Sequence, residues 1–217
     1  EEQELLAVFE MRKDTYIWHM DSIREAQQTL VRALEDYEKK YPYRYGMKKA
    51  EIQTMYFQKI KPNVFDRIVE FFVERGCIRR AEEFLCTPEF EVKKDGTYQK
   101  VAENFLNVFE KAGYDFVRYS EIDLKGVSRD MADDILNILL TEGKVVRVTE
   151  EMYTLAEYME QAKEKIKAHL ADDPLITIAQ VRDMFGTSRK SAKPILEYMD
   201  ALKITKKMGA ESERVAY

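Results

Sequence analysis

The hydrophobic positions follow two periods along the chain, the three-to-four-residue spacing of amphipathic helices and the alternation of short strands. Long helices are predicted over residues 22–41, 98–112 and 157–170. Shorter helices are predicted over residues 50–57, 64–75, 119–124 and 130–142, with two more after residue 176. Strands are predicted over residues 5–11, 15–19, 77–80, 144–148, 152–155, 204–208 and 214–217. The chain is therefore expected to be mainly α with small β-hairpins, an α+β fold.

The C-terminal segment has the order of a helix-turn-helix followed by a hairpin. Thr177 is placed to cap a short helix, Gly186 supplies a turn, and Thr187 or Ser188 is placed to cap a second helix. Two strands follow, and the loop at residues 209–213 between them is the predicted wing. These features together predict a winged helix.

The start of the second helix has the chemistry of a phosphate site. It opens with Ser188, Arg189 and Lys190, so a hydroxyl, a guanidinium and an ammonium stand where free backbone N–H groups also point outward. Pro194 lies inside the same helix and removes a backbone donor, so a kink is expected there. The loop at residues 209–213 holds two glutamates, which leaves the wing's contribution to anion binding open.

The same order of elements occurs twice more upstream. Ile78, Val145 and Ile204 each follow a third-helix end and align at separations of 67 and 59 residues. Recurrence of one supersecondary unit predicts an array of tandem winged helices. The expected organisation is a wing hairpin at residues 1–20 and winged helices at 21–93, 94–155 and 156–217.

The connections between these modules differ. The first hairpin, around a turn at residues 12–14, is interpreted as the wing of a module whose earlier part is missing, and the chain as a fragment of a longer protein. Residues 87–97 contain Pro88 and Gly96 and are a candidate hinge. No such segment follows Leu155, so the last two modules are expected to hold a fixed orientation.

Charge is unevenly distributed over the 217 residues. The net charge is −5, but from Ile176 onward the balance is +3, so the remainder carries −8. An acidic chain with a basic end is expected to present only that end to a polyanion. No apolar run approaches the roughly 20 residues of a membrane span, and the acidic residues 1–4 are no signal peptide. A reduced cytoplasmic protein without membrane contact is predicted.

Few residues are candidates for catalysis or metal binding. Cys77 and Cys86 are interpreted as structural thiols on neighbouring strands, with a disulfide or a metal site as the alternative. His19 and His169 have no partners at catalytic spacing, and His169 is expected to be solvated. The aromatic turn at residues 41–46 either packs or stacks on RNA bases. No GxxxxGK phosphate loop is present, so no enzyme activity is predicted.

Several short motifs point to one family. They are Ile176-Thr177, Val181-Arg182-Asp183, Gly186-Thr187-Ser188-Arg189-Lys190, Pro194-Ile195-Leu196-Glu197-Tyr198-Met199-Asp200, Gly209 and Arg214-Val215. With these motifs the last quarter of the chain resembles the last winged-helix module of bacterial selenocysteine-specific elongation factors. Over the middle of the chain the resemblance rests on the repeated architecture. The family implies that residues 156–217 bind the mRNA hairpin (selenocysteine insertion element) that recodes a UGA stop codon.

The resemblance also implies which residues and partners are involved. The hairpin-binding surface would consist of Arg182, Ser188, Arg189, Lys190, Lys193, Lys206, Lys207 and Arg214. An mRNA stem-loop is the expected partner, and the middle modules would act as a spacer. In the full-length factor GTP, selenocysteyl-tRNA and the ribosome are further partners. This fragment lacks the GTPase part, so it is expected to need no cofactor or metal and to be a monomer.

Alternatives remain open at this stage. Ser188 serves either as a helix cap or as a phosphate ligand, and the cationic cluster is either a binding surface or a solvated face. A DNA-binding winged-helix transcriptional regulator would insert its second helix into the major groove. The A-form major groove of RNA is too deep and narrow for that, so RNA is read at loops, bulges and the backbone. A winged-helix protein-interaction scaffold would bind neither nucleic acid.

Overall fold

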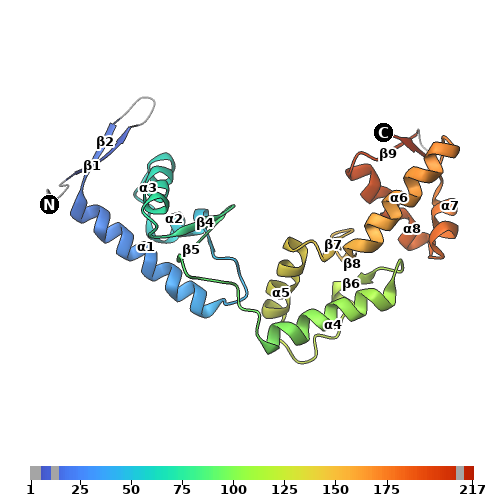
Figure 1. Cartoon of the computed structure of the whole chain (residues 1–217), viewed down its shortest axis with the longest axis horizontal. Helices are drawn as coiled ribbons and strands as arrows, with labels where there is room; N and C mark the ends of the chain where they lie inside the picture. Colours follow the sequence, from blue (N-terminus) through green and yellow to red (C-terminus); the bar gives the residue numbers. More distant parts are fainter. Residues whose placement is uncertain (1–5, 11–14, 209–212) are drawn as a thin grey trace. The chain divides into compact units, whose positions relative to one another are not determined.

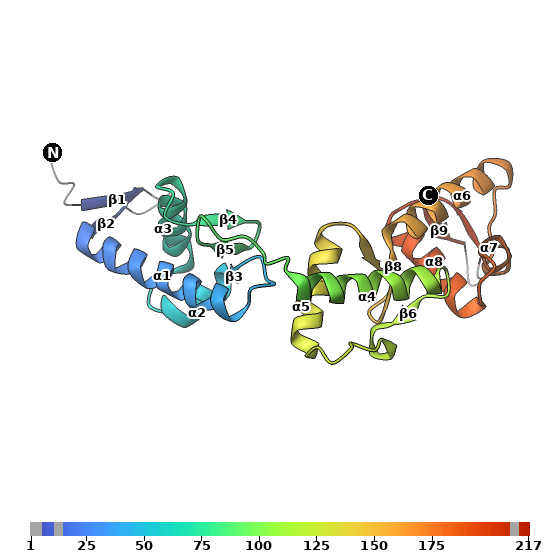
Figure 2. The same cartoon turned by 60° about the horizontal axis from the view of Figure 1, so that its bottom comes forward.

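The computed structural model describes residues 6–10, 15–208 and 213–217. The chain divides into two compact units, Glu1–Lys93 and Lys94–Tyr217, which are described in turn. Both units consist of helices with small antiparallel sheets (Figures 1 and 2). The acidic residues 1–4, the predicted turn at 12–14 and residues 209–212 of the predicted wing loop lie outside the described residues.

The first unit opens with a hairpin and continues into a helical domain. Its elements are β1 (Leu6–Glu10), β2 (Thr15–His19), α1 (Met20–Lys40), β3 (Met47–Lys48), α2 (Lys49–Tyr56), α3 (Pro62–Glu74), β4 (Arg79–Ala81) and β5 (Phe84–Cys86). The second sheet has the strand order β3-β5-β4. The apolar stripe of α1 packs with Phe65 and Phe72 of α3 and Leu85 of β5 in one core, which Ala7 and Phe9 of the first hairpin also enter.

The aromatic turn after α1 is packed into this unit. Tyr43 is buried, and the guanidinium of Arg44 lies 4.0 Å from the ring centroid of Tyr41. Gly46 has a φ of +138°, and a Cβ there would lie 2.3 Å from the carbonyl oxygen of Leu85. Of the two interpretations of residues 41–46, packing is therefore confirmed.

The segment after β5 is fastened to the first unit. The N–H and the hydroxyl of Thr87 donate to the buried carboxylate of Glu38 on α1, at 2.6 and 2.8 Å. The N–H of Lys93 donates to the carbonyl of Pro42 at 2.8 Å. Thr87 and Lys93 of the predicted hinge at residues 87–97 are thus hydrogen-bonded within the first unit, and the division between the units falls after Lys93.

The second unit contains two helix-rich modules in succession. Its elements are α4 (Gly96–Ala112), β6 (Val117–Arg118), the 3₁₀ turn η1 (Tyr119–Glu121), α5 (Arg129–Thr141), β7 (Val145–Arg147), β8 (Met152–Leu155), α6 (Ala156–Asp172), α7 (Ile178–Phe185), α8 (Arg189–Ala201), β9 (Thr205–Lys207) and β10 (Arg214–Ala216). The helix predicted at residues 119–124 is only this 3₁₀ turn. Among the described residues, no helix combines the length and the apolar character that a membrane span needs.

One topology recurs within the described residues. A short extended segment after the first helix of each module pairs with the second strand of that module's hairpin: β3 with β5, β6 with β8, and Ile176 with Arg214 of β10. Two helices lie between, except that η1 replaces the first of them in the middle module. This is the winged-helix arrangement, so the predicted fold class is confirmed.

The third helix of each module also ends in the same way. A residue with positive φ is followed by an N–H that bonds a carbonyl five residues earlier. The positive-φ residues are Gly76 (+68°), Gly143 (+66°) and Lys203 (+55°), and the donors after them are Cys77, Lys144 and Ile204. The predicted alignment of Ile204 with Ile78 and Val145 was therefore wrong by one residue. Thr205 is the true equivalent, because Lys203 occupies a position that the other modules give to glycine.

The last two modules share a hydrophobic core. Phe116, Val148 and Met152 of the middle module belong to one buried cluster with Met159, Ile166 and Val181 of the last module. The ring of Tyr114 also lies 4.5 Å from that of Phe185, centroid to centroid. The fixed orientation expected from the missing linker is thus observed within the second unit.

Candidate nucleic-acid interface

The helix-turn-helix of the last module is set by local sequence. Thr177 and Gln180 form a reciprocal capping box at the start of α7. Gly186 ends α7 in the left-handed conformation, with φ +59° and ψ +35°. Ser188 then occupies the N-cap position of α8, but its side chain makes no capping hydrogen bond. Ser188 thus holds the predicted cap position, without a capping hydrogen bond from its side chain.

Seven of the eight predicted contact residues are exposed. They are Arg182 on α7, Ser188 at the N-cap, Arg189, Lys190 and Lys193 on α8, and Lys206 and Lys207 on β9. The guanidinium of Arg182 bonds Asp183 at 2.7 Å, and the ammonium of Lys193 lies 3.4 Å from Glu197. Both pairs are at the surface, where ion pairs exchange readily for other anions. The cations thus concentrate at the start of α8 and on the first strand of the hairpin.

The side chains of Arg182 and Arg189 line the same hollow. Its volume is about 200 Å³, and Thr177, Ile178 and Ala179 at the start of α7 form the rest of its wall. Two guanidiniums in one hollow suit a phosphate or an unstacked base. A guanidinium donates paired hydrogen bonds to a phosphate and can stack on a base. The structure therefore brings together two predicted contact residues from different helices.

Arg214 does not belong to this surface. Only 4% of the residue is exposed, and its Nε donates to Oδ2 of Asp200 on α8 at 2.9 Å. The other oxygen of Asp200 accepts from the hydroxyl of Thr205 on β9 at 2.6 Å. Asp200 thus ties both strands of the hairpin to α8, and the charge of Arg214, which was predicted as an RNA contact, is already paired inside the fold.

Sequence reasoning missed an acid from the middle module at the same place. Oδ1 of Asp115 accepts from the hydroxyl of Thr187 at 2.5 Å and from the N–H of Ser188 at 3.3 Å. The hydroxyl of Thr187 also lies 2.9 Å from the carbonyl oxygen of Tyr114. Asp115 and Thr187 are 72 residues apart, so no local pattern could have signalled this contact.

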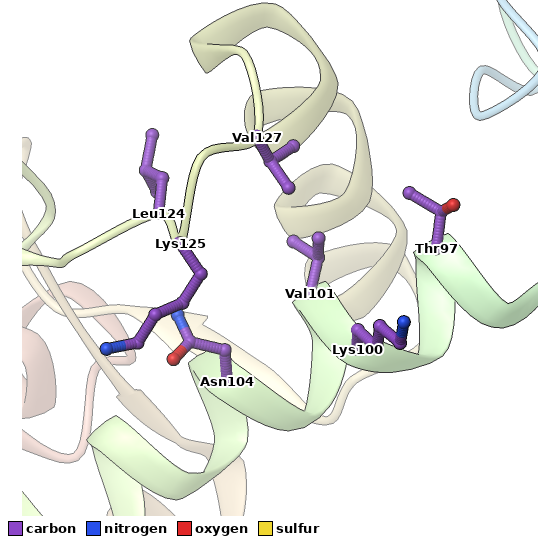
Figure 3. A pocket seen from close by; sticks show the side chains of 7 residues that line it. All are labelled: Thr97, Lys100, Val101, Asn104, Leu124, Lys125 and Val127. Atoms are coloured by element: carbon purple, nitrogen blue, oxygen red, sulfur yellow. The ribbon is translucent and has the colours of Figure 1, made fainter.

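A second hollow lies in the middle module, between α4 and the segment that leads into α5 (Figure 3). Its volume is about 140 Å³, and its lining is Thr97, Lys100, Val101, Asn104, Leu124, Lys125 and Val127. The ammonium of Lys125 is paired with Asp123 at 2.8 Å, and the amide of Asn104 donates to the carbonyl of Asp123. The polar groups of Lys125 and Asn104 are thus used within the module, so the hollow offers few groups to a ligand.

The remaining candidate residues have structural surroundings. Cys77 and Cys86 are free thiols, and burial raises the pKa of the Cys86 thiol. His19 accepts the N–H of Asp21 as the N-cap of α1. His169 is half-buried and hydrogen-bonds the carbonyl of Leu175 at 3.0 Å, so the expectation that it is solvated was wrong. No group of three or more potential metal ligands occurs in the part of the chain that the structure describes.

Comparisons with known proteins agree with this architecture. Family models of winged-helix domains of elongation factor SelB match residues 31–85 and 168–211. The chain is 23% identical to a selenocysteine-specific elongation factor of Desulfomicrobium baculatum over 81% of its length, and 20% identical to that of Haemophilus influenzae over 92%. It covers 28% and 32% of these two proteins, so it spans about a third or less of the relatives it matches.

Solved structures show the same fold. The crystal structure of a bacterial selenocysteine-specific elongation factor superposes on 97% of this chain with a TM-score of 0.55, at 17% sequence identity and covering 32% of that protein. The motifs from Ile176 to Val215 and these matches lead to one family. Residues 31–85 and 168–211 match winged-helix domains of elongation factor SelB, which confirms the resemblance predicted from the C-terminal residues.

Proposed function

We propose that this chain binds an mRNA hairpin and so tethers a selenocysteine-specific elongation factor to the message for UGA recoding. The observation that carries the proposal is the cluster of exposed cations at the start of α8 and on β9, within the segment that the SelB family model matches. The names of the relatives support the same role, because both are selenocysteine-specific elongation factors.

The distribution of charge along α8 favours a hairpin over duplex DNA. The exposed face of the helix carries Arg189, Lys190 and Lys193 in its first turns and then Glu197. A helix that lies in a DNA major groove offers donors to base edges and phosphates along that face, and Glu197 would repel the phosphates there. Contact through the helix start alone suits a backbone bend or an unpaired base at a hairpin tip.

The other partners belong to the proposal as well. GTP, selenocysteyl-tRNA and the ribosome are proposed partners of the longer protein, which would supply the GTPase activity. For this chain we propose hairpin binding as a monomer in the cytoplasm, without nucleotide, metal or other cofactor.

Fluorescence anisotropy with a labelled selenocysteine-type hairpin tests the proposal, with a matched DNA duplex as competitor and two salt concentrations. Arg189→Ala/Lys190→Ala should weaken hairpin binding and lower the slope of log affinity against log salt by about 1 to 2. Lys100→Ala/Lys111→Ala on α4 removes the same charge from two exposed lysines of the middle module and should change little.

Each alternative has a distinct result. Equal binding of hairpin and duplex would favour a DNA-binding regulator. No binding to either would favour a protein-interaction scaffold. Hairpin binding that is unaffected by the α8 substitution, or equally weakened by the α4 substitution, would keep the function but refute the site.

A further inference from the structure

A carboxylate from the middle module accepts hydrogen bonds at the N-terminus of α8. Ser188 holds the N-cap position without a side-chain cap, and its N–H instead donates to Asp115, which lies between α4 and β6. The same carboxylate oxygen accepts the hydroxyl of Thr187. A carboxylate at this position satisfies a backbone donor that the helix leaves open and interacts favourably with the positive end of the helix dipole.

The surrounding contacts hold this carboxylate in place. The ring of Tyr114, the preceding residue, lies 4.5 Å from that of Phe185 in the last turn of α7 and makes an edge contact with that of Tyr158 of α6 at 5.3 Å, centroid to centroid. Its carbonyl oxygen lies 2.9 Å from the hydroxyl of Thr187. The turn between α7 and α8 is therefore fixed from both sides, by α7 within its own module and by residues 114–115 of the middle module.

Electrostatics alone would make this acid unfavourable for an RNA-binding surface. Asp115 is exposed, and it contacts the residue that directly precedes Arg189 and Lys190. A negative charge so close to phosphates opposes their binding. The geometry nevertheless places the carboxylate where it orders the helix start that carries the cations, and ordering a binding group before the ligand arrives lowers the entropy lost on binding.

We propose that Asp115 is a positioning residue for hairpin binding, so that the middle module sets the orientation of Arg189 and Lys190 on the last one. The inference rests on the proposed function and deepens it. The middle module is then more than a spacer, because a carboxylate that never touches RNA raises the affinity of the surface next to it.

Two substitutions separate ordering from charge repulsion. Asp115→Ala removes both the charge and the acceptor, and it should weaken hairpin binding roughly tenfold, as expected for losing a capping interaction. Asp115→Asn removes the charge but keeps an amide oxygen as acceptor, so its affinity should stay within about threefold of the wild type. If repulsion decided the outcome, both variants would bind more tightly than the wild type, most clearly at low salt.

A control and a ligand-free measurement complete the test. Glu103→Ala on α4 removes an equal exposed charge away from the turn and should not weaken binding. Hydrogen exchange over residues 186–190 without RNA should be faster in Asp115→Ala than in the wild type. Unchanged or tighter hairpin binding by Asp115→Ala would overturn the positioning role while leaving the proposed function intact. A wild-type chain that fails to bind the hairpin would refute the proposed function itself, and the positioning role with it.

Discussion

Replacing Asp200 by alanine is expected to destabilise the second unit strongly. The substitution leaves Arg214, whose side chain is 5% exposed, without its carboxylate, and removes the acceptor of the Thr205 hydroxyl. Breaking a buried ion pair from one side costs about 3–5 kcal/mol. The Asp200 side chain is 27% exposed, so water compensates part of this cost, and we expect a loss of about 3 kcal/mol.

Urea unfolding can assign this loss to one unit. The chain has one tryptophan, Trp18, which packs against the core of the first unit. Its fluorescence therefore follows the first unit, whereas far-UV circular dichroism follows the helices of both units. At a slope of about 2 kcal/mol per molar urea, a loss of about 3 kcal/mol lowers the midpoint of the second unit by about 1.5 M. The Trp18 transition should not move.

The control replaces the buried cation by an apolar side chain. Arg214→Met combined with Asp200→Leu removes both charges and should recover much of the stability, because a buried pair replaced by apolar groups is often nearly neutral. Arg214→Met alone should leave the salt slope of hairpin affinity unchanged, whereas loss of a phosphate contact would lower it by about 1. A destabilisation by Asp200→Ala below about 1 kcal/mol, or an equal shift of the Trp18 transition, would refute this account.

Two further substitutions test the second unit, both by urea unfolding followed with circular dichroism. Lys203→Gly should stabilise the second unit by about 1 kcal/mol, because Lys203 holds a φ of +55° that glycine adopts without strain. At the equivalent position of the middle module, Gly143→Ala should destabilise the unit. Effects of the same sign from the two substitutions would contradict this reasoning. Hydrogen bonds from Lys144 and Lys94 hold the pKa of the Glu142 carboxyl below its usual range. A lowered pKa stabilises the fold above the pKa of the unfolded chain and ceases to do so as the pH falls through the folded value. Glu142→Gln should therefore be less stable than the wild type at pH 7, with the difference shrinking as the pH falls through the acid range. A difference independent of pH would refute the role of the charge.

Local sequence was sufficient for most of the elements but not for the shortest ones, nor for the ends and contacts of the rest. The capping box of Thr177 and the left-handed Gly186 were readable because each depends on residues within one turn. Ile204 was aligned one residue too early because Lys203 has the positive φ that glycine has in the other modules, and no propensity rule predicts a lysine there.

The same limit of local sequence explains two residues at the candidate interface whose hydrogen-bond partners the sequence did not predict. Arg214 was predicted as an RNA contact because an arginine in a basic segment has the same sequence signature whether it is solvated or buried. Its surroundings depend on Asp200 of α8, and only the tertiary structure shows that the two side chains meet. Asp115 was overlooked because one more acidic residue in an acidic module does not stand out in the sequence, and its partners lie in the next module.

Charge type is therefore a poor guide to function at this surface, and the hydrogen-bond partner is a better one. A buried arginine that bonds an aspartate holds β10 to α8, and an exposed aspartate that bonds a helix start is proposed to order the cations beside it. If both assignments hold, removing a positive charge at Arg214 leaves the salt dependence of hairpin binding unchanged, and replacing Asp115 by alanine weakens binding. Simple charge counting predicts the opposite in both cases, so the pair of measurements distinguishes structural organisation from net charge as the origin of affinity.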